Sequence, residues 1–169
     1  EYYGLDGEND QSYRYFMNQN LFDHVNIKKE NTYVPLGSAE CIDEESARYE
    51  QLISDLGGVD LQLLGIGQNG HIGFNEPDDH FPATVHGAQL TESTINANSR
   101  LFAKKEDVPT QAITMGIGTI MKARKLLLIA GADKADIIEK VLHGHVTPDV
   151  PASVLQLHSD ATIILVEKN

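Results

Sequence analysis

The stretch Val59-Asp60-Leu61-Gln62-Leu63-Leu64-Gly65-Ile66-Gly67 decides the fold class of this sequence. It is mostly apolar and runs directly into glycines, which is typical of a central parallel strand that ends in a ligand-binding loop. Parallel sheets are covered by the helices that connect their strands. We therefore expect an α/β protein built around this strand.

Helical and strand-like patterns alternate along the rest of the chain. Apolar residues at helical spacing predict helices at residues 13–22, 43–56, 91–102, 133–143 and 152–157. Strands are predicted at residues 31–36, 125–130 and 162–167. Residues 112–123 are ambiguous and are expected to become helical from Gly118.

This alternation implies parallel βαβ units with right-handed crossovers. We predict one three-layer, Rossmann-like domain over residues 1–169, a parallel sheet with helices on both faces. Ligands in such sheets bind at the carboxyl ends of the strands. The loop at residues 77–84, which contains acids and prolines, is the candidate for a mobile lid.

Composition limits the class of protein. The 169 residues are 41% hydrophobic and 22% charged, which excludes intrinsic disorder. Cys41 is the single cysteine, so a disulfide framework is excluded, a reducing compartment is favoured and Cys41 is expected to be a packing residue. No apolar run approaches the roughly 20 residues needed to cross a bilayer, and a cytoplasmic protein is expected.

The formal net charge is −12, which argues against nucleic acid and anionic membrane surfaces as partners. A small phosphorylated ligand stays compatible with this charge. One or two cations and a helix N-terminus are enough to bind a phosphate group within an acidic protein.

The loop that follows the first strand carries the candidate chemistry. Asn69, His71 and Glu76 place an amide, an imidazole and a carboxylate close together in sequence, on a backbone that glycines allow to turn sharply. A histidine beside a carboxylate can hold one tautomer and transfer a proton near neutral pH. Asn69 can orient either partner but carries no charge.

Two other interpretations of this loop remain open from the residues alone. Gly65, Gly67 and Gly70 have the spacing of a dinucleotide-binding loop, but no helical pattern and no ribose-binding acid follow at the expected distance. A purely structural glycine turn that holds a core histidine is the other alternative. No cofactor is expected.

The seven histidines of the sequence raise the question of a metal site. His143 and His145 form the close pair, but His143 precedes Gly144 at a predicted helix end, where such residues act as caps. His71 and Glu76 lie on a loop and lack helical ligand spacing. No metal is expected.

The string from Gly65 to Pro77 resembles the signature of the glucosamine-6-phosphate deaminases. The resemblance extends over most of the chain, through Glu1-Tyr2-Tyr3-Gly4-Leu5, Ser12-Tyr13, Phe16-Met17, Ala97-Asn98-Ser99-Arg100, Gly116-Ile117-Gly118-Thr119 and Leu155-Gln156-Leu157-His158. The related 6-phosphogluconolactonases share a glycine-rich Gly-His loop but lack the Phe74-Asn75-Glu76-Pro77 that follows it here.

The resemblance implies conversion of D-glucosamine 6-phosphate and water into D-fructose 6-phosphate and ammonia, in the catabolism of N-acetylglucosamine and sialic acid. It implies that His71 is the acid and base that opens the pyranose ring, with Asn69 and Glu76 as partners. Many members carry Asp in place of Asn69, whereas members similar to those of Gram-positive bacteria carry Asn.

The resemblance also implies that Arg100 and Lys134 bind the substrate phosphate. Lys134 is near a predicted helix N-terminus, where an ammonium and backbone amides converge. Allosteric members bind a second sugar phosphate through cations that are absent from the corresponding stretch, residues 86–89. The sequence therefore resembles the unregulated members, and its oligomeric state stays open.

In this family a further base, the Asp of an Asp-Glu-Tyr-x-Gly motif, moves a proton from C2 to C1. That Asp would directly precede Glu1, and the family's phosphate loop would lie further upstream. We therefore expect the 169 residues to lack an N-terminal portion of the domain. Residues 1–169 alone are then expected not to complete the deamination at a normal rate. A 6-phosphogluconolactonase-like hydrolase and a non-catalytic sugar-phosphate-binding fragment are the alternatives.

Overall fold

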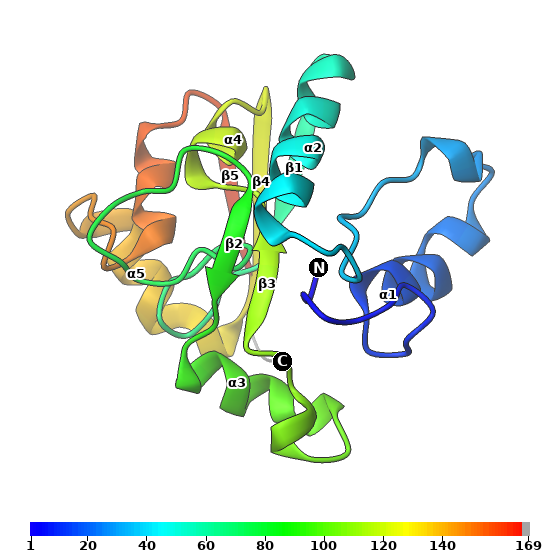
Figure 1. Ribbon diagram of the computed structural model, residues 1–169. Helices are drawn as coiled ribbons and strands as arrows, with labels where there is room; N and C mark the ends of the chain where they lie inside the picture. The colour runs from blue at the N-terminus through cyan, green and yellow to red at the C-terminus, as the bar shows by residue number, and fades with distance from the viewer. Residues whose placement is uncertain (167–169) are drawn as a thin grey trace. The chain divides into compact units, whose positions relative to one another are not determined.

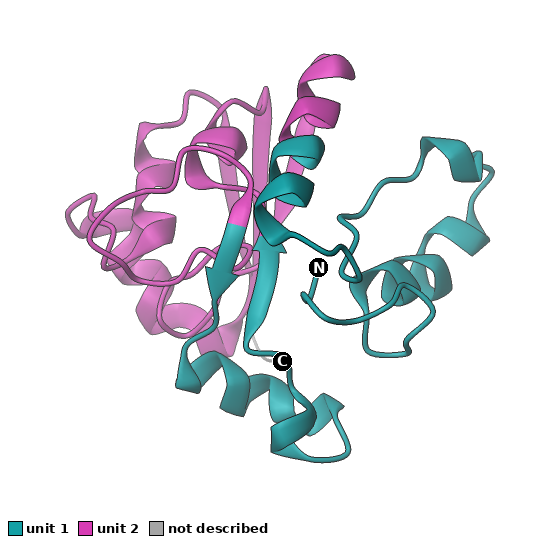
Figure 2. Cartoon of the chain, viewed as in Figure 1, with its two compact units in different colours: residues 1–49, 87–113 teal, residues 50–86, 114–169 magenta. Residues whose placement is uncertain are grey.

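The computed structural model describes residues 1–166, and its elements are shown in Figure 1. The chain forms two compact units, which Figure 2 colours separately. Unit 1 consists of Glu1–Tyr49 and Gly87–Ile113, and unit 2 of Glu50–His86 and Thr114–Asn169. No helix within residues 1–166 is long and apolar enough to cross a membrane.

A parallel three-stranded sheet forms the centre of unit 2. Its strands are β1 (Leu61–Leu64), β4 (Lys125–Gly131) and β5 (Ala161–Val166), in the order β1-β4-β5. Helices flank this sheet, so the parallel α/β fold predicted from the sequence is confirmed. The last expected strand is found as β5, although its predicted end at Glu167 is outside the described residues.

Apolar side chains on one face of the sheet form the core of unit 2. On that face Leu126, Leu128 and Ala130 alternate along β4 with less buried residues, as the pleat of a strand requires. They pack with α4 (Ile117–Met121), α5 (Ala135–His143) and the 3₁₀ helix Pro151–Leu157. The opposite face of the described sheet leaves several apolar side chains exposed: Leu61, Leu63, Ile129, Ile164 and Val166.

Unit 1 contains mostly short elements. The helices are α1 (Tyr13–Asn20), most of α2 (Ile42–Asp55), which continues into unit 2, and α3 (Glu92–Asn98). Short 3₁₀ turns cover Phe22–His24, Lys29–Asn31, Ser99–Leu101 and Lys105–Asp107; a further one in unit 2, Ala132–Lys134, precedes α5. The strands β2 (His86–Gln89) and β3 (Gln111–Thr114) form a two-stranded sheet.

The N-terminus of α1 is capped by two side chains. The Ser12 hydroxyl accepts the Tyr15 amide at 3.0 Å, and the buried Glu1 carboxylate accepts the Tyr13 and Arg14 amides at 2.9 Å each. These groups satisfy first-turn amides that no helical carbonyl can reach. The helix start predicted from the sequence around Ser12 is therefore confirmed.

The strand predicted at residues 31–36 is wrong. A 3₁₀ turn at Lys29–Asn31 is followed by an irregular segment. Pro35 has no amide for a ladder, and the Leu36 amide donates to the carboxylate of Glu45 at 2.7 Å. The Glu45 carboxylate therefore accepts the Leu36 amide, which in a strand would donate to the carbonyl of a neighbouring strand.

Two further expectations need correction, and the structure contains one strand that was not predicted. Residues 112–123 begin with the end of β3, and the helix α4 starts at Ile117 rather than at Gly118. The strand β2 was not foreseen. Cys41 is exposed rather than packed. The lid at residues 77–84 and the single domain stay predictions.

Candidate active site

The loop Gly65–Pro77 follows β1 within unit 2 and turns at two glycines. Gly70 has a φ of +85° and Gly73 a φ of +59°, a left-handed conformation that side chains with a Cβ rarely adopt. A Cβ on Gly70 would also be 2.8 Å from a methyl carbon of Val150. The turn therefore requires glycine at position 70 for two reasons: the left-handed backbone conformation and the lack of space for a Cβ.

Gly67 makes room for the imidazole of His71. A Cβ at Gly67 would overlap three atoms of that ring, and the Gly67 amide donates to the His71 carbonyl at 3.0 Å. The loop thus folds back on itself so that the ring lies directly against the Gly67 backbone. The side chain of His71 keeps 20% of its surface exposed, which leaves the imidazole accessible to a ligand.

Three polar side chains of the loop meet at one carboxylate oxygen. The Nδ2 of Asn69 donates to Oε2 of Glu76 at 2.7 Å, and Nδ1 of His71 lies 3.3 Å from the same oxygen. The His71 amide donates to Oδ1 of Asn69 at 3.2 Å, which fixes the orientation of the Asn69 amide. The side chain of Glu76 is only 8% exposed, so its negative charge is held close to the imidazole with little screening by water.

This arrangement suits proton transfer. A carboxylate beside Nδ1 favours the tautomer that carries a proton on that nitrogen and leaves Nε2 as the base. The contact between His71 and Glu76 is a close ion-pair distance rather than an aligned hydrogen bond. Such contacts commonly shorten when a substrate binds.

Lys134 lies at the same sheet edge as this loop. The strands β1 and β4 are parallel neighbours, so the segments that follow them emerge at one edge. Nε2 of Gln68 is 3.4 Å from both the carbonyl oxygen and Oδ2 of Asp133, which links the two segments. Nζ of Lys134 lies 3.6 Å from Oδ2 of Asp133.

Arg100 belongs to unit 1, where it lies in the 3₁₀ turn Ser99–Leu101 directly after α3. Its side chain is exposed. Of the residues predicted from the sequence, Asn69, His71, Glu76 and Lys134 are found at one edge of one sheet. The assignment of Arg100 to the same ligand stays a prediction from the resemblance.

The structure adds two residues that sequence reasoning missed. Oγ1 of Thr114, at the end of β3, accepts the amide of Phe74 at 3.0 Å. The side chain of Asn75 is buried, and its Nδ2 donates to the carbonyls of Ile72 at 2.9 Å and Met115 at 2.8 Å. In the sequence, Asn75 could have been found as a polar amide that follows the apolar residues Ile72 and Phe74 of the loop. The sequence around Thr114 has no comparable feature.

One cluster in the described residues has the composition of a cation site. Asp78, Asp79 and His80 are all exposed, and Nδ1 of His80 is 2.6 Å from Oδ1 of Asp79. The hydrogen bond with Asp79, together with the charge of Asp78, raises the pKa of His80, and the same hydrogen bond lowers the pKa of Asp79. This pairing accounts for the cluster without an ion, because it neutralises part of the local negative charge.

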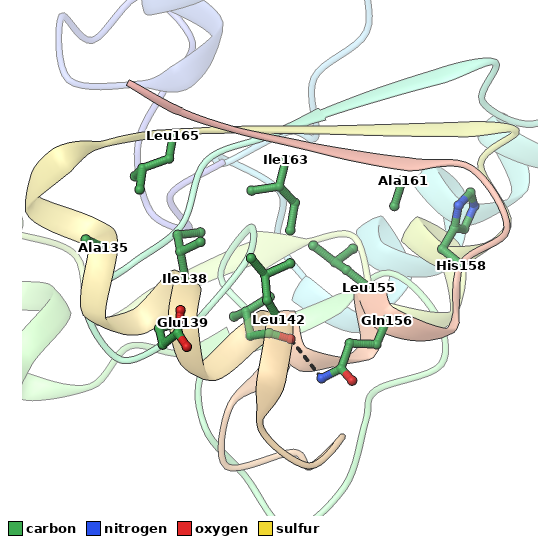
Figure 3. A pocket seen from close by; sticks show the side chains of 11 residues that line it. Ala135, Ile138, Glu139, Leu142, Leu155, Gln156, His158, Ala161, Ile163 and Leu165 are labelled. Atoms are coloured by element: carbon green, nitrogen blue, oxygen red, sulfur yellow. Dashed lines mark hydrogen bonds between the residues drawn. The ribbon is translucent and has the colours of Figure 1, made fainter. Parts of the chain in front are cut away.

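A groove of about 770 Å³ opens elsewhere in unit 2, between α5, the 3₁₀ helix Pro151–Leu157 and β5 (Figure 3). Its walls are mostly aliphatic, with Ile138, Leu155 and Ile163 among them. None of the loop residues Gly65–Pro77 lines it. Among the described residues 1–166, no Lys or Arg for a sugar phosphate lines this groove, so the polar loop is the better candidate for the active site.

Known proteins resemble this chain over almost its whole length. Residues 5–164 match the family described as glucosamine-6-phosphate isomerases/6-phosphogluconolactonase. A curated protein from Lachnoclostridium phytofermentans named glucosamine-6-phosphate deaminase is 63% identical over 165 residues, which cover 97% of this chain and 70% of that protein. A protein of the same name from Clostridioides difficile is 55% identical over 169 residues, 99% of this chain and 68% of that one.

A solved structure is also similar. It is described as a monomeric glucosamine-6-phosphate deaminase, with a TM-score of 0.95 and 43% sequence identity. The match covers 99% of this chain and 70% of that one. The similarity is therefore both in sequence and in fold.

Proposed function

This chain belongs to the family of glucosamine-6-phosphate isomerases and 6-phosphogluconolactonases, and we propose that within this family it acts as a glucosamine-6-phosphate deaminase. The enzyme converts D-glucosamine 6-phosphate and water into D-fructose 6-phosphate and ammonia. The observation that carries the proposal is the contact of His71 with the largely buried carboxylate of Glu76, because Glu76 belongs to the part of the loop that resembles the deaminases.

His71 opens the pyranose ring in this proposal. Ring opening requires that the anomeric hydroxyl lose a proton and that the ring oxygen gain one, as the bond between C1 and the ring oxygen breaks. A neutral imidazole can accept the first proton at Nε2 and return it to the ring oxygen. The ring of His71 suits this transfer, because it is packed against the Gly67 backbone and still keeps part of its surface open to a ligand.

Glu76 and Asn69 support that proton transfer. During the transfer the imidazole becomes a cation, which the carboxylate 3.3 Å away stabilises. Asn69 holds the carboxylate by a 2.7 Å hydrogen bond and adds no second negative charge. Glu76 therefore supplies the charge and Asn69 fixes its position.

Lys134 binds the phosphate group in this proposal. Its ammonium lies at the same strand edge as His71, next to the start of α5, where helix amides add positive potential. Lys134 is paired with Asp133 at 3.6 Å, a partly exposed contact that a doubly charged phosphate can outcompete. Arg100 is a second candidate for the phosphate, on the strength of the resemblance alone.

The proposal extends to partners and location. The substrate is a small phosphorylated amino sugar, and the net charge of −12 disfavours nucleic acid. We place the reaction in the cytoplasm, because a sugar phosphate is charged and does not pass through the apolar interior of a bilayer unaided.

The test is an assay of the full-length protein with D-glucosamine 6-phosphate, in which ammonia and fructose 6-phosphate are both measured. Equal amounts of the two products are expected. Hydrolysis of 6-phosphogluconolactone without turnover of the amino sugar would instead place the protein with the lactonases. Binding of the amino sugar without any product would identify a non-catalytic binder.

A further inference from the structure

We infer that Thr114 is a positioning residue for the reaction, which holds the turn Ile72–Glu76 so that the Glu76 carboxylate faces His71. The inference rests on the proposed role of the His71–Glu76 pair. Thr114 is 6% exposed and lies at the end of β3, distant in sequence from the loop it contacts.

The turn that carries Glu76 has little regular structure of its own. Its internal bonds run from the Asn75 amide to the Ile72 carbonyl at 3.1 Å and from the Glu76 amide to the Phe74 carbonyl at 3.1 Å. Gly73, within the turn, has a left-handed backbone. A segment of this kind needs an external anchor to hold one conformation.

The end of β3 supplies that anchor at two points. The Thr114 hydroxyl accepts the Phe74 amide at 3.0 Å, and the Met115 carbonyl accepts Nδ2 of Asn75 at 2.8 Å. The hydroxyl also packs so closely on Gly73 that a Cβ there would be 2.7 Å from Oγ1. The two residues immediately before Glu76 are therefore both held by Thr114 and its neighbour.

The position of Glu76 decides what His71 can do. Its oxygen Oε2 is the meeting point of the Asn69 amide and the His71 ring. A displacement of about 1 Å at the turn would separate Oε2 from Nδ1, and misplacements of this size cost up to about 100-fold in rate. The Thr114 hydroxyl bonds to the backbone of the turn, so it acts on the carboxylate through the turn.

Two variants remove the anchor and one retains it. Thr114→Val replaces the hydroxyl by a methyl group of similar size, and Thr114→Ala removes the side chain that crowds Gly73. Thr114→Ser keeps a hydroxyl at the same position. The matched control is Thr119→Val, because Thr119 is 3% exposed and its hydroxyl donates to Glu50 at 2.7 Å, outside the loop.

The experiment measures kcat and KM of the full-length protein for ammonia release from D-glucosamine 6-phosphate, at a temperature where each variant is folded. We expect Thr114→Val and Thr114→Ala to lower kcat about tenfold with KM within about twofold of the parent. Thr114→Ser should restore kcat, and Thr119→Val should lower the melting temperature without lowering kcat. If Thr114→Val does not fold, Thr114→Ala gives the same comparison.

A double-mutant cycle separates positioning from general destabilisation. In a Glu76→Gln background, Thr114→Val should add little further loss of kcat, because the charge that Thr114 positions is already absent. An undiminished kcat in both Thr114 variants, failure of the serine to rescue, or a full tenfold loss in the Glu76→Gln background would each overturn the inference. A parent protein that releases no ammonia would contradict the proposed function instead.

Discussion

Replacing Glu76 by Gln removes one negative charge from the site and leaves its shape nearly unchanged. The amide oxygen of the introduced side chain can still accept the Asn69 hydrogen bond that now reaches Oε2 at 2.7 Å. The amide is neutral, however, and it cannot stabilise an imidazolium as a carboxylate does. The variant should therefore fold as the parent does and open the sugar ring more slowly.

The expected magnitude follows from the burial and distance of the pair. Glu76 is 8% exposed and its oxygen is 3.3 Å from Nδ1, so screening by water is weak. Once the contact tightens into a hydrogen bond in the substrate complex, it should contribute what hydrogen bonds to charged groups typically do, about 1.5–3 kcal/mol. If that stabilisation is realised mainly when His71 is protonated in the transition state, kcat should fall about 10- to 150-fold.

The assay compares kcat, KM and melting temperature for the parent, Glu76→Gln and a control variant. Glu139→Gln is the control, because Glu139 is on the surface of α5 with 73% of its side chain exposed. We expect a loss of kcat in Glu76→Gln, little change in KM, and parental values in Glu139→Gln. A Glu76→Gln variant with undiminished kcat would refute the reasoning, since the charge would then play no part in ring opening.

Three further predictions concern the fold and the phosphate. Gly70→Ala should destabilise the protein by about 1–3 kcal/mol, because Gly70 has a φ of +85° and an added Cβ would be 2.8 Å from Val150. Thermal or urea unfolding measures this, and parental stability would contradict it. Burial opposes ionisation of Glu45, but hydrogen bonds from Arg48 and a backbone amide outweigh it and lower the pKa of Glu45 below 4.5. The stability that Glu45 adds is thus present above pH 4.5 and is lost as the pH falls through its lowered pKa. Glu45→Gln should therefore make the free energy of unfolding fall less steeply as the pH is lowered below 4.5. An unchanged fall would count against the pairing of Glu45 with Arg48. Lys134→Ala should raise KM about tenfold with kcat affected less, and an unaltered KM would remove Lys134 from the phosphate site.

The core of the fold could be predicted because its signal is local. An apolar stretch that ends in glycines identifies β1, and the apolar run at β4 identifies its neighbour. The strands β2 and β3 have four residues each, and His86-Gly87-Ala88-Gln89 has too few apolar residues to show an alternation. Strands this short depend on their partners more than on their own sequence.

The prediction of a strand at residues 31–36 was wrong for a related reason. Its β-branched and aromatic residues favour extended backbone, and the backbone after Thr32 is indeed not helical. What the pattern could not show is that the Glu45 carboxylate takes the Leu36 amide. Tertiary contacts of this kind override local propensity.

The candidate site was predictable to the extent that it is contiguous in sequence. Asn69, His71 and Glu76 come from one loop, and the structure places their side chains in contact. Lys134 could be placed at the same edge from the topology of parallel strands. Thr114 could not be predicted, because its contact with Phe74 joins residues 40 positions apart and depends on where β3 ends.

The central claim is that His71, supported by Glu76, opens the ring of D-glucosamine 6-phosphate. The most direct test is ¹³C NMR of substrate labelled at C1, which follows exchange between the two anomers and the appearance of fructose 6-phosphate in one sample. The full-length parent protein should accelerate anomer exchange and form labelled fructose 6-phosphate, and His71→Gln should slow both by about 10²- to 10⁴-fold. Anomer exchange at the parent rate in folded His71→Gln would contradict the account.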